Sequence, residues 1–354
     1  MSRLDRYIIS HILGLTAIVA LGLLAIHCFV SFVAEIDEIG QGTFGYRELL
    51  SYTLWLAPTG LYVMMPIIAM LGTLMGLGTL ASQSELTAMR AAGVSLLRLG
   101  RATLTGGLVL GVVCVAIGDW LAPLGQIEAD SLMSEAQSGV PAGLGGKSVW
   151  LRDGDHVFQI RNLVAEDHIA SVEIYTLGPE LNLQAAMVVD EGRYRDGVWH
   201  FSGIRRTEFG AHNARVVEQA DFEWRGSLSP EVLRLFVLKA DSLSTAGLVR
   251  LLNYLRENNL DPSSYALALA RKIVAPLTVM AMMLFAVPFV LGPLRNTGAG
   301  QRLFVGVLVG LAFYVINEVS ANSGQLYGWN PLVAAGAPTL AFGLIGLWRL
   351  GRVR

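Results

Sequence analysis

The residues nearest to a known chemical motif are Gly146, Lys147 and Ser148, which resemble the end of a phosphate-binding loop. Such a loop needs a glycine five places before the glycine of its Gly-Lys-Ser run, so that the backbone can curl around phosphate, and a helix after it. Pro141 occupies that place, and the alternating residues that follow predict a strand. We therefore predict that this chain has no nucleotide site of its own.

Catalytic and metal-binding patterns are also missing from the sequence. The six histidines are scattered without a pair at metal-ligand spacing, and no Gly-x-Ser-x-Gly run marks a nucleophile elbow. Cys28 and Cys114 lie in apolar stretches, where cysteine behaves as a small buried hydrophobic residue. The net charge of −2, with no basic block, offers no footprint for nucleic acid. The sequence thus predicts a protein that is not an enzyme and binds no metal, cofactor or nucleic acid.

The composition is that of a membrane protein with one hydrophilic insert. Hydrophobic residues make up 53% of the chain and charged residues 15%, whereas about 25% of a soluble domain is charged. The charges are concentrated: 33 of the 142 positions from 123 to 264 are charged, against 21 of the other 212. One polar domain therefore interrupts an apolar chain.

Six apolar stretches are long enough to cross a bilayer as helices, which takes about 20 residues. They lie at 12–34, 49–84, 102–122, 268–292, 303–321 and 331–349. The second stretch exceeds a single span, so we expect a tilted or partly interfacial helix that carries Pro58 and Pro66. Six spans place both termini on the same side of the membrane.

Arginines near the ends of these stretches predict the orientation, because short cytoplasmic loops are rich in Lys and Arg. Only Arg47 lies on the opposite side from ten others, which are Arg3, Arg6, Arg90, Arg98, Arg101, Arg295, Arg302, Arg349, Arg352 and Arg354. We therefore predict cytoplasmic termini and an exported insert.

The insert has the pattern of an all-β domain. Short alternating segments such as 149–151, 157–160 and 181–183 recur, and Asp153-Gly154 and Asp196-Gly197 are typical of two-residue hairpin turns. Regular short strands favour a sandwich or a jelly roll. Leucines then recur on one helical face of residues 244–257, which predicts either a hinge to the membrane or a helix packed on the β domain.

The connection between the second and third spans predicts a short helix. Ser84 is a plausible N-cap, Glu85 suits the first turn, and Gly93 suits the C-terminal end. Small residues and Met89 on its exposed face would fit a groove of another protein. The alternative, a helix resting on the lipid surface, fits the same pattern equally well.

Other features indicate structure rather than chemistry. Three glycine pairs at four-residue spacing, at 72/76, 107/111 and 306/310, permit close helix packing within the chain or with a partner. Charged residues within spans are functional candidates by default. Asp119, Arg271, Lys272 and Glu318 fall near the exported ends of the spans, however, so structural anchoring is favoured for each.

Several segments together resemble the LptF/LptG permeases of the lipopolysaccharide exporter, and most of all the LptG branch of that family. They are Leu-Asp-Arg-Tyr-Ile at 4–8, Gly-Gln-Gly at 40–42, the run 66–78 leading into Ser-Glu-Leu at 84–86, and Gly-Pro-Leu-Arg at 292–295. The resemblance covers essentially the whole chain. It implies spans one to three in residues 1–122, a periplasmic β-jellyroll and following helix in 123–264, and spans four to six in 265–354.

The resemblance also implies a function and partners. Such a permease pairs with an LptF-like permease in the bacterial inner membrane and encloses a cavity for lipopolysaccharide from the outer leaflet. An LptB-like ATPase dimer, which binds the ATP and Mg²⁺, drives it through a coupling helix at about 84–98, and an LptC-like protein and periplasmic bridge receive the substrate. The coupling residues would be Glu85, Leu86, Met89, Arg90, Ala91 and Gly93.

Candidates for the cavity wall are Phe29, Phe32, Val33, Ile36, Met64, Met65, Phe313, Tyr314 and Ile316. Members of the family often have lysines after span one, where this chain has Glu35, Asp37 and Glu38. The head-group candidates are therefore Asp37 and Glu38, acting through a divalent cation or an amine-modified head group, together with Arg271 and Lys272. Two other functions fit: a scaffold that displays the β domain and transports nothing, and a permease of another ABC exporter class.

Overall fold

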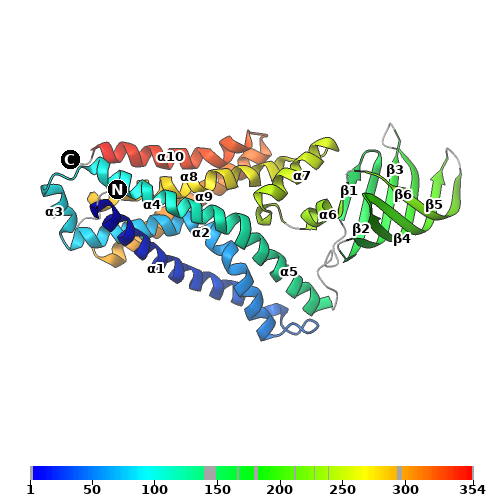
Figure 1. Cartoon of the computed structure of the whole chain (residues 1–354), viewed down its shortest axis with the longest axis horizontal. Helices are drawn as coiled ribbons and strands as arrows, with labels where there is room; N and C mark the ends of the chain where they lie inside the picture. The colour runs from blue at the N-terminus through cyan, green and yellow to red at the C-terminus, as the bar shows by residue number, and fades with distance from the viewer. Residues whose placement is uncertain are drawn as a thin grey trace. The chain divides into compact units, whose positions relative to one another are not determined.

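The computed structural model (Figure 1) describes residues 3–138, 149–165, 167–178, 182–210, 213–226, 228–237, 239–292 and 297–352. The chain divides into two compact units. The helical unit comprises Met1–Ala34, Thr53–Gly125 and Ser263–Arg354, and the β unit comprises Glu35–Tyr52 and Gln126–Pro262. Residues 141–148, which include the run that resembles a phosphate-binding loop, lie outside the described residues, as do Arg295 and Arg354.

Six helices are long and apolar enough to cross a membrane in the part of the chain that the structure describes, as predicted. They are α1 (Arg3–Ala34), α2 (Tyr46–Ser82), α4 (Leu96–Ala116), α8 (Ser263–Leu291), α9 (Ala299–Leu326) and α10 (Pro331–Arg352). The long second stretch is a single helix of 37 residues with Pro58 and Pro66 inside it. The short helix α3 (Glu85–Ala91) joins α2 to α4.

The three glycine pairs all pack helices within the chain. An added Cβ at Gly72 would lie 2.5 Å from Cα of Thr16, and one at Gly76 would lie 2.9 Å from Cα of Ile12. Gly107 and Gly111 meet α8 in the same way, and Gly306 and Gly310 meet α2. The missing side chains allow backbones to approach closely, which strengthens van der Waals packing where no hydrophobic effect operates between helices.

The helix of the third span does not end at residue 122, where the predicted apolar stretch ends. Helix α4 continues through a π-helical turn (Ile117–Leu121) into α5 (Ala122–Ser138). A π-helical turn adds a residue to the helical turn and interrupts the regular hydrogen-bond ladder. The carbonyl of Gly118 in that turn accepts a hydrogen bond from Nζ of Lys272, at 2.5 Å.

The insert is an antiparallel sheet, as predicted, and the strand order of its described part is simpler than that of a jelly roll. The six described strands are β1 (Val149–Asp153), β2 (His156–Ala165), β3 (His168–Leu177), β4 (Leu183–Arg195), β5 (Val198–Phe209) and β6 (Ala214–Trp224). Strands adjacent in the sheet are consecutive in the chain. A jelly roll instead contains Greek-key crossings between two sheets. The described part is therefore a meander, because strands that follow one another in the chain pair with one another.

The sheet curls strongly, so its first and last strands share a core. Six strands spaced by about 4.8 Å would separate the first from the last by about 24 Å in a flat sheet. Instead, the Trp224 ring on β6 lies 4.4 Å from the His156 ring on β2, and its Nε1 donates to Asp153 on β1 at 3.0 Å. Burial lowers the pKa of His156. The curl thus replaces the second sheet of a sandwich and buries Phe158, Trp199 and Phe201.

One of the two predicted hairpin turns of the insert is confirmed as predicted. Asp196 and Gly197 both have positive φ, 52° and 81°, as the tight hairpin turn between β4 and β5 requires. The other hairpin is displaced by one residue, since Asp153 pairs with His156 and the loop is Gly154-Asp155.

The predicted leucine-faced helix is α7 (Thr245–Glu257), and the shorter α6 (Pro230–Val237) precedes it. Its leucines Leu248, Leu251, Leu252 and Leu255 are all buried. The Tyr254 hydroxyl donates to the carbonyl of Arg152 on β1 at 2.8 Å, and burial raises the pKa of Tyr254. Of the two alternatives, the structure supports the helix packed on the β domain.

Candidate functional site

One side of helix α3 is apolar and packs against the rest of the helical unit. Leu86 is buried, and Met89 packs against the main core cluster of the unit. Met89 was expected on the exposed face, and that expectation is wrong, because Leu86 and Met89 are three residues apart and share one side of the helix. Thr87, Ala88, Arg90 and Ala91 are exposed instead. The exposed face is therefore small and carries one positive charge.

The ends of α3 differ in how well they match the prediction. Ser84 occupies the N-cap position with φ of 62°, and its side chain makes no capping hydrogen bond. Gly93 ends the helix as expected, with φ of 87°, its N–H bonded to the carbonyl of Arg90 and the N–H of Val94 bonded to that of Met89. This pair of bonds is a Schellman motif, which favours glycine at the left-handed position.

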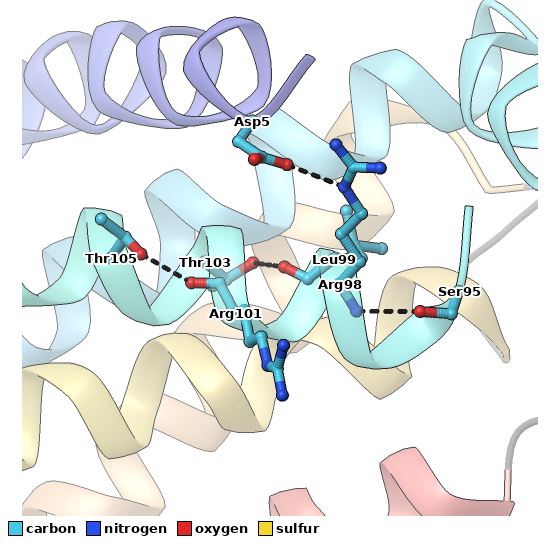
Figure 2. A network of polar contacts seen from close by, with 7 residues as sticks. All are labelled: Asp5, Ser95, Arg98, Leu99, Arg101, Thr103 and Thr105. Atoms are coloured by element: carbon cyan, nitrogen blue, oxygen red, sulfur yellow. Dashed lines mark hydrogen bonds and ion pairs between the residues drawn. The ribbon is translucent and has the colours of Figure 1, made fainter. Parts of the chain in front are cut away.

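Two side-chain contacts join the start of α1 to this region. The hydroxyl of Tyr7 donates to Glu85 Oε2 at 2.9 Å. Figure 2 shows Asp5 of α1 facing Arg98 in the first turn of α4, and Arg98 Nε lies 3.0 Å from Asp5 Oδ1. Ser95 caps α4 through the N–H of Arg98. Neither Tyr7 nor Asp5 was predicted as a site residue, although both belong to the 4–8 segment that carried the family resemblance.

The predicted cavity residues divide into three groups by exposure. Phe29, Val33, Ile36, Tyr314 and Ile316 are exposed large apolar side chains, with Phe29 at 68%. Phe32 and Met64 are half-buried. Met65 and Phe313 are each only 4% exposed and belong to the core cluster of the helical unit. The last two therefore pack helices together, because each faces the neighbouring helices of its own chain.

The two cationic head-group candidates form ion pairs within the chain. Arg271 lies 3.0 Å from Glu318, which joins α8 to α9, and Lys272 lies 3.3 Å from Asp119 in the π-helical turn. The Lys272 ammonium also lies 5.5 Å from the centre of the Tyr62 ring. The side chain of Lys272 is only 7% exposed. The charges at these span ends anchor helices to one another, which was the favoured interpretation.

The loop after α1 is fastened to the end of α5. The N–H of Thr43 donates to the carbonyl of Ala136 at 2.6 Å, and Gln137 donates to Glu38 at 2.9 Å. An added Cβ at Gly42 would lie 2.3 Å from the same carbonyl, which explains a glycine there. Of the acidic head-group candidates, Asp37 is exposed and Glu38 is engaged by Gln137.

No preformed metal site accompanies these carboxylates. Over the described ranges, no group of three or more His, Cys, Asp or Glu side chains is close enough to hold a metal ion. A divalent cation at Asp37 would therefore need further oxygen ligands from a bound molecule, since calcium takes six to eight oxygen ligands and magnesium six.

The chain is similar to known proteins over nearly its whole length. The family "Lipopolysaccharide export system permease LptF/LptG" matches residues 6–352. The chain belongs to the LptF/LptG family. It is 31% identical to the lipopolysaccharide export system permease protein LptG of Haemophilus influenzae, over all of this chain and 99% of that protein. It is 29% identical to the LptG protein of Escherichia coli K12, over 99% and 98% of the two chains.

Membership of the LptF/LptG family confirms the main functional prediction. The chain is a multi-pass membrane permease of the lipopolysaccharide export system, and no catalytic family is indicated. The scaffold and the permease of another exporter class are therefore set aside. In this LptF/LptG permease, α3 and the apolar faces of α1 and α9 are among the exposed surfaces of the described chain.

Proposed function

We propose that this permease is the LptG-like half of an ATP-driven machine that extracts lipopolysaccharide from the outer leaflet of the bacterial inner membrane. It pairs with an LptF-like permease and is driven by an LptB-like ATPase dimer. The substrate then passes to an LptC-like protein and the periplasmic bridge. Both termini lie in the cytoplasm and the β unit lies in the periplasm.

The exposed apolar faces of α1 and α9 carry this proposal. In its most apolar 18-residue window α1 has no buried residue, and α9 has 17%, whereas α2 has 67% and α8 has 61%. Two spans with so little packing in their own chain have apolar surface left for a partner permease and for acyl chains. Exposing apolar acyl-chain surface to water costs about 25 cal/mol per Å². Apolar side chains of the protein must therefore cover the acyl chains once the lipid has left the bilayer.

The described residues of the loop after α1 include no lysine that could bind the head group. The two cationic candidates on α8 are both paired. Lys272 is buried against Asp119, and Arg271 is paired with Glu318. Asp37 remains exposed in the short turn Ile36–Glu38. A carboxylate there could form an ion pair with an amine-modified head group. It could also bind a divalent cation that is already bound to a head-group phosphate. Arg271, at 27% side-chain exposure, is the better cationic candidate of the two.

The ATPase acts on the small exposed face of α3, and Gly93 tests this assignment. Replacing Gly93 by Val forces a β-branched residue into a left-handed conformation, which costs about 1–2 kcal/mol, although an added Cβ there would meet nothing within 4 Å. We expect Gly93→Val to lower lipopolysaccharide extraction per ATP hydrolysed by about tenfold while the complex still assembles. Glu85→Ala should act in the same direction.

The matched control is Gly93→Asn, because asparagine tolerates the left-handed region. It should retain most of the extraction. The measurement is ATP hydrolysis and extraction by the purified complex in lipid nanodiscs. Full extraction by a normally assembled Gly93→Val complex would show that α3 is not the coupling element, and purification without any ATPase would contradict the proposed assembly.

A further inference from the structure

Helix α1 contacts the region around α3 at two separate points. Tyr7 donates to Glu85 at the first residue of α3, at 2.9 Å. Asp5 lies 3.0 Å from Arg98 in the first turn of α4 (Figure 2). Glu85 and Arg98 stand at the two ends of residues 84–98, the predicted coupling segment. Two residues in the first turns of α1 therefore hold both ends of that segment.

The rest of α1 links these contacts to the exposed apolar surface. Ile12 and Thr16 pack against Gly76 and Gly72 of α2, so the cytoplasmic half of α1 is held closely on its neighbour. Further along the same helix, Phe29, Val30 and Val33 are exposed. Since α1 is one continuous helix from Arg3 to Ala34, a displacement of its first turns displaces that apolar face as well.

We propose that Tyr7 and Asp5 are positioning residues that fasten α1 to the coupling segment, so that both move together when the ATPase acts. This inference rests on the proposed function. It assigns Glu85 a role inside the chain. The carboxylate accepts a hydrogen bond from the Tyr7 hydroxyl, and this bond couples a movement of α3 to α1. Hydrogen bonds to an ionised group are roughly twice as strong as neutral ones, and the Asp5–Arg98 pair adds a second contact that resists rotation about the first.

Two roles of Glu85 make opposite predictions for Tyr7→Phe, which removes only the hydroxyl. If Glu85 acts through Tyr7, this variant should lower extraction per ATP by about threefold to tenfold. It should also add nothing to Glu85→Gln in the double variant. If Glu85 acts only on the ATPase, Tyr7→Phe should leave the ratio unchanged. Tyr327→Phe, which removes the hydroxyl of an exposed tyrosine directly after α9, is the matched control and should have no effect.

The ion pair is tested by exchanging its charges. Asp5→Arg and Arg98→Asp should each lower extraction per ATP, because each places like charges side by side. The double variant Asp5→Arg/Arg98→Asp restores opposite charges and should recover most of the loss. A double variant as defective as the single ones, in a complex that assembles normally, would overturn the proposed contact.

A measurement on the chain alone separates this inference from the proposed function. Hydrogen exchange of the amides in Glu85–Ala91 should become faster in Tyr7→Phe than in the wild type, and remain unchanged in Tyr327→Phe. Unchanged exchange in Tyr7→Phe would refute the fastening even if transport were impaired. The opposite pair of results is faster exchange in Tyr7→Phe together with a wild-type complex that extracts no lipopolysaccharide. This pair would support the fastening and refute the proposed function.

Discussion

Lys272 shows how a charged residue is retained within a membrane span. Its ammonium is shared among the Gly118 carbonyl, the Asp119 carboxylate and the face of the Tyr62 ring. An unpaired charge in the apolar interior would cost several kcal/mol. The π-helical turn directs a carbonyl toward the ammonium, and an added Cβ at Gly118 would lie 2.4 Å from the Tyr62 ring. These neighbours together explain a buried lysine without assigning it to substrate.

Removing this lysine should destabilise the helical unit. We expect Lys272→Met to lower the free energy of unfolding by about 3 kcal/mol, because the carboxylate of Asp119 loses a buried partner. Lys272→Met/Asp119→Asn should recover much of that loss, since no unpaired charge remains. Loss of helical structure during titration of the detergent-solubilised chain with SDS measures both.

The pair Arg271–Glu318 provides the comparison for Lys272. Its side chains are 27% and 35% exposed, against 7% for Lys272. Arg271→Met should therefore cost only about 1 kcal/mol. A larger loss in Arg271→Met than in Lys272→Met would show that exposure does not decide the contribution of these pairs.

At the scale of elements, glycine positions decide which helices lie side by side. Glycines 72 and 76 of α2 meet α1, and glycines 306 and 310 of α9 meet α2. The four-residue spacing in the sequence indicated close packing and left the partner open. Only the structure shows that each of these pairs contacts a helix of its own chain, which leaves the opposite faces of α1 and α9 exposed.

Gly72→Ala should disrupt the packing of α1 on α2. The added Cβ would lie 2.1 Å from Thr16 Oγ1 and 2.5 Å from its Cα, so the backbone itself must move, at a cost of about 1–3 kcal/mol. Gly22→Ala is the matched control, because nothing lies within 4 Å of its added Cβ. The same SDS titration should show a loss for Gly72→Ala alone. Equal stability of the two variants would contradict the close approach of α1 and α2.

At the scale of the whole molecule, the distribution of charge predicts the orientation in the membrane. Arginines near the ends of the spans lie almost entirely on the side of the termini, which is the cytoplasmic side by the positive-inside rule. We therefore expect the β unit on the opposite side, in the periplasm. This orientation would place α3 within reach of the proposed cytoplasmic ATPase.

Single cysteines test this orientation in a Cys28→Ala/Cys114→Ala background. Asp167 lies in an exposed turn of the β unit and Ser84 precedes α3, also exposed. An impermeant maleimide should label Asp167→Cys in intact spheroplasts and label Ser84→Cys only after lysis. The reverse pattern would place the β unit in the cytoplasm and remove α3 from the ATPase.

Much of the helical architecture could be predicted from the sequence, because hydropathy and span length act locally along the chain. The six spans, the long α2 with two prolines, the glycine end of α3 and the Asp196-Gly197 turn all follow from residue type and spacing. Ser84 occupies the predicted N-cap position, but its side chain makes no capping hydrogen bond. The exposure of Met89 was mispredicted, because the helices around α3 determine which of its sides is covered.

The sequence by itself determined six membrane-spanning helices and an inserted antiparallel β domain, since each span must satisfy its own backbone hydrogen bonds in lipid. Tertiary structure alone decided which side chains remain available. It buries Met65 and Phe313, pairs Lys272 with Asp119 and Arg271 with Glu318, curls one meander into a closed core, and joins Tyr7 to Glu85. These contacts join residues far apart in the chain, so no local pattern of hydrophobicity or spacing specifies them.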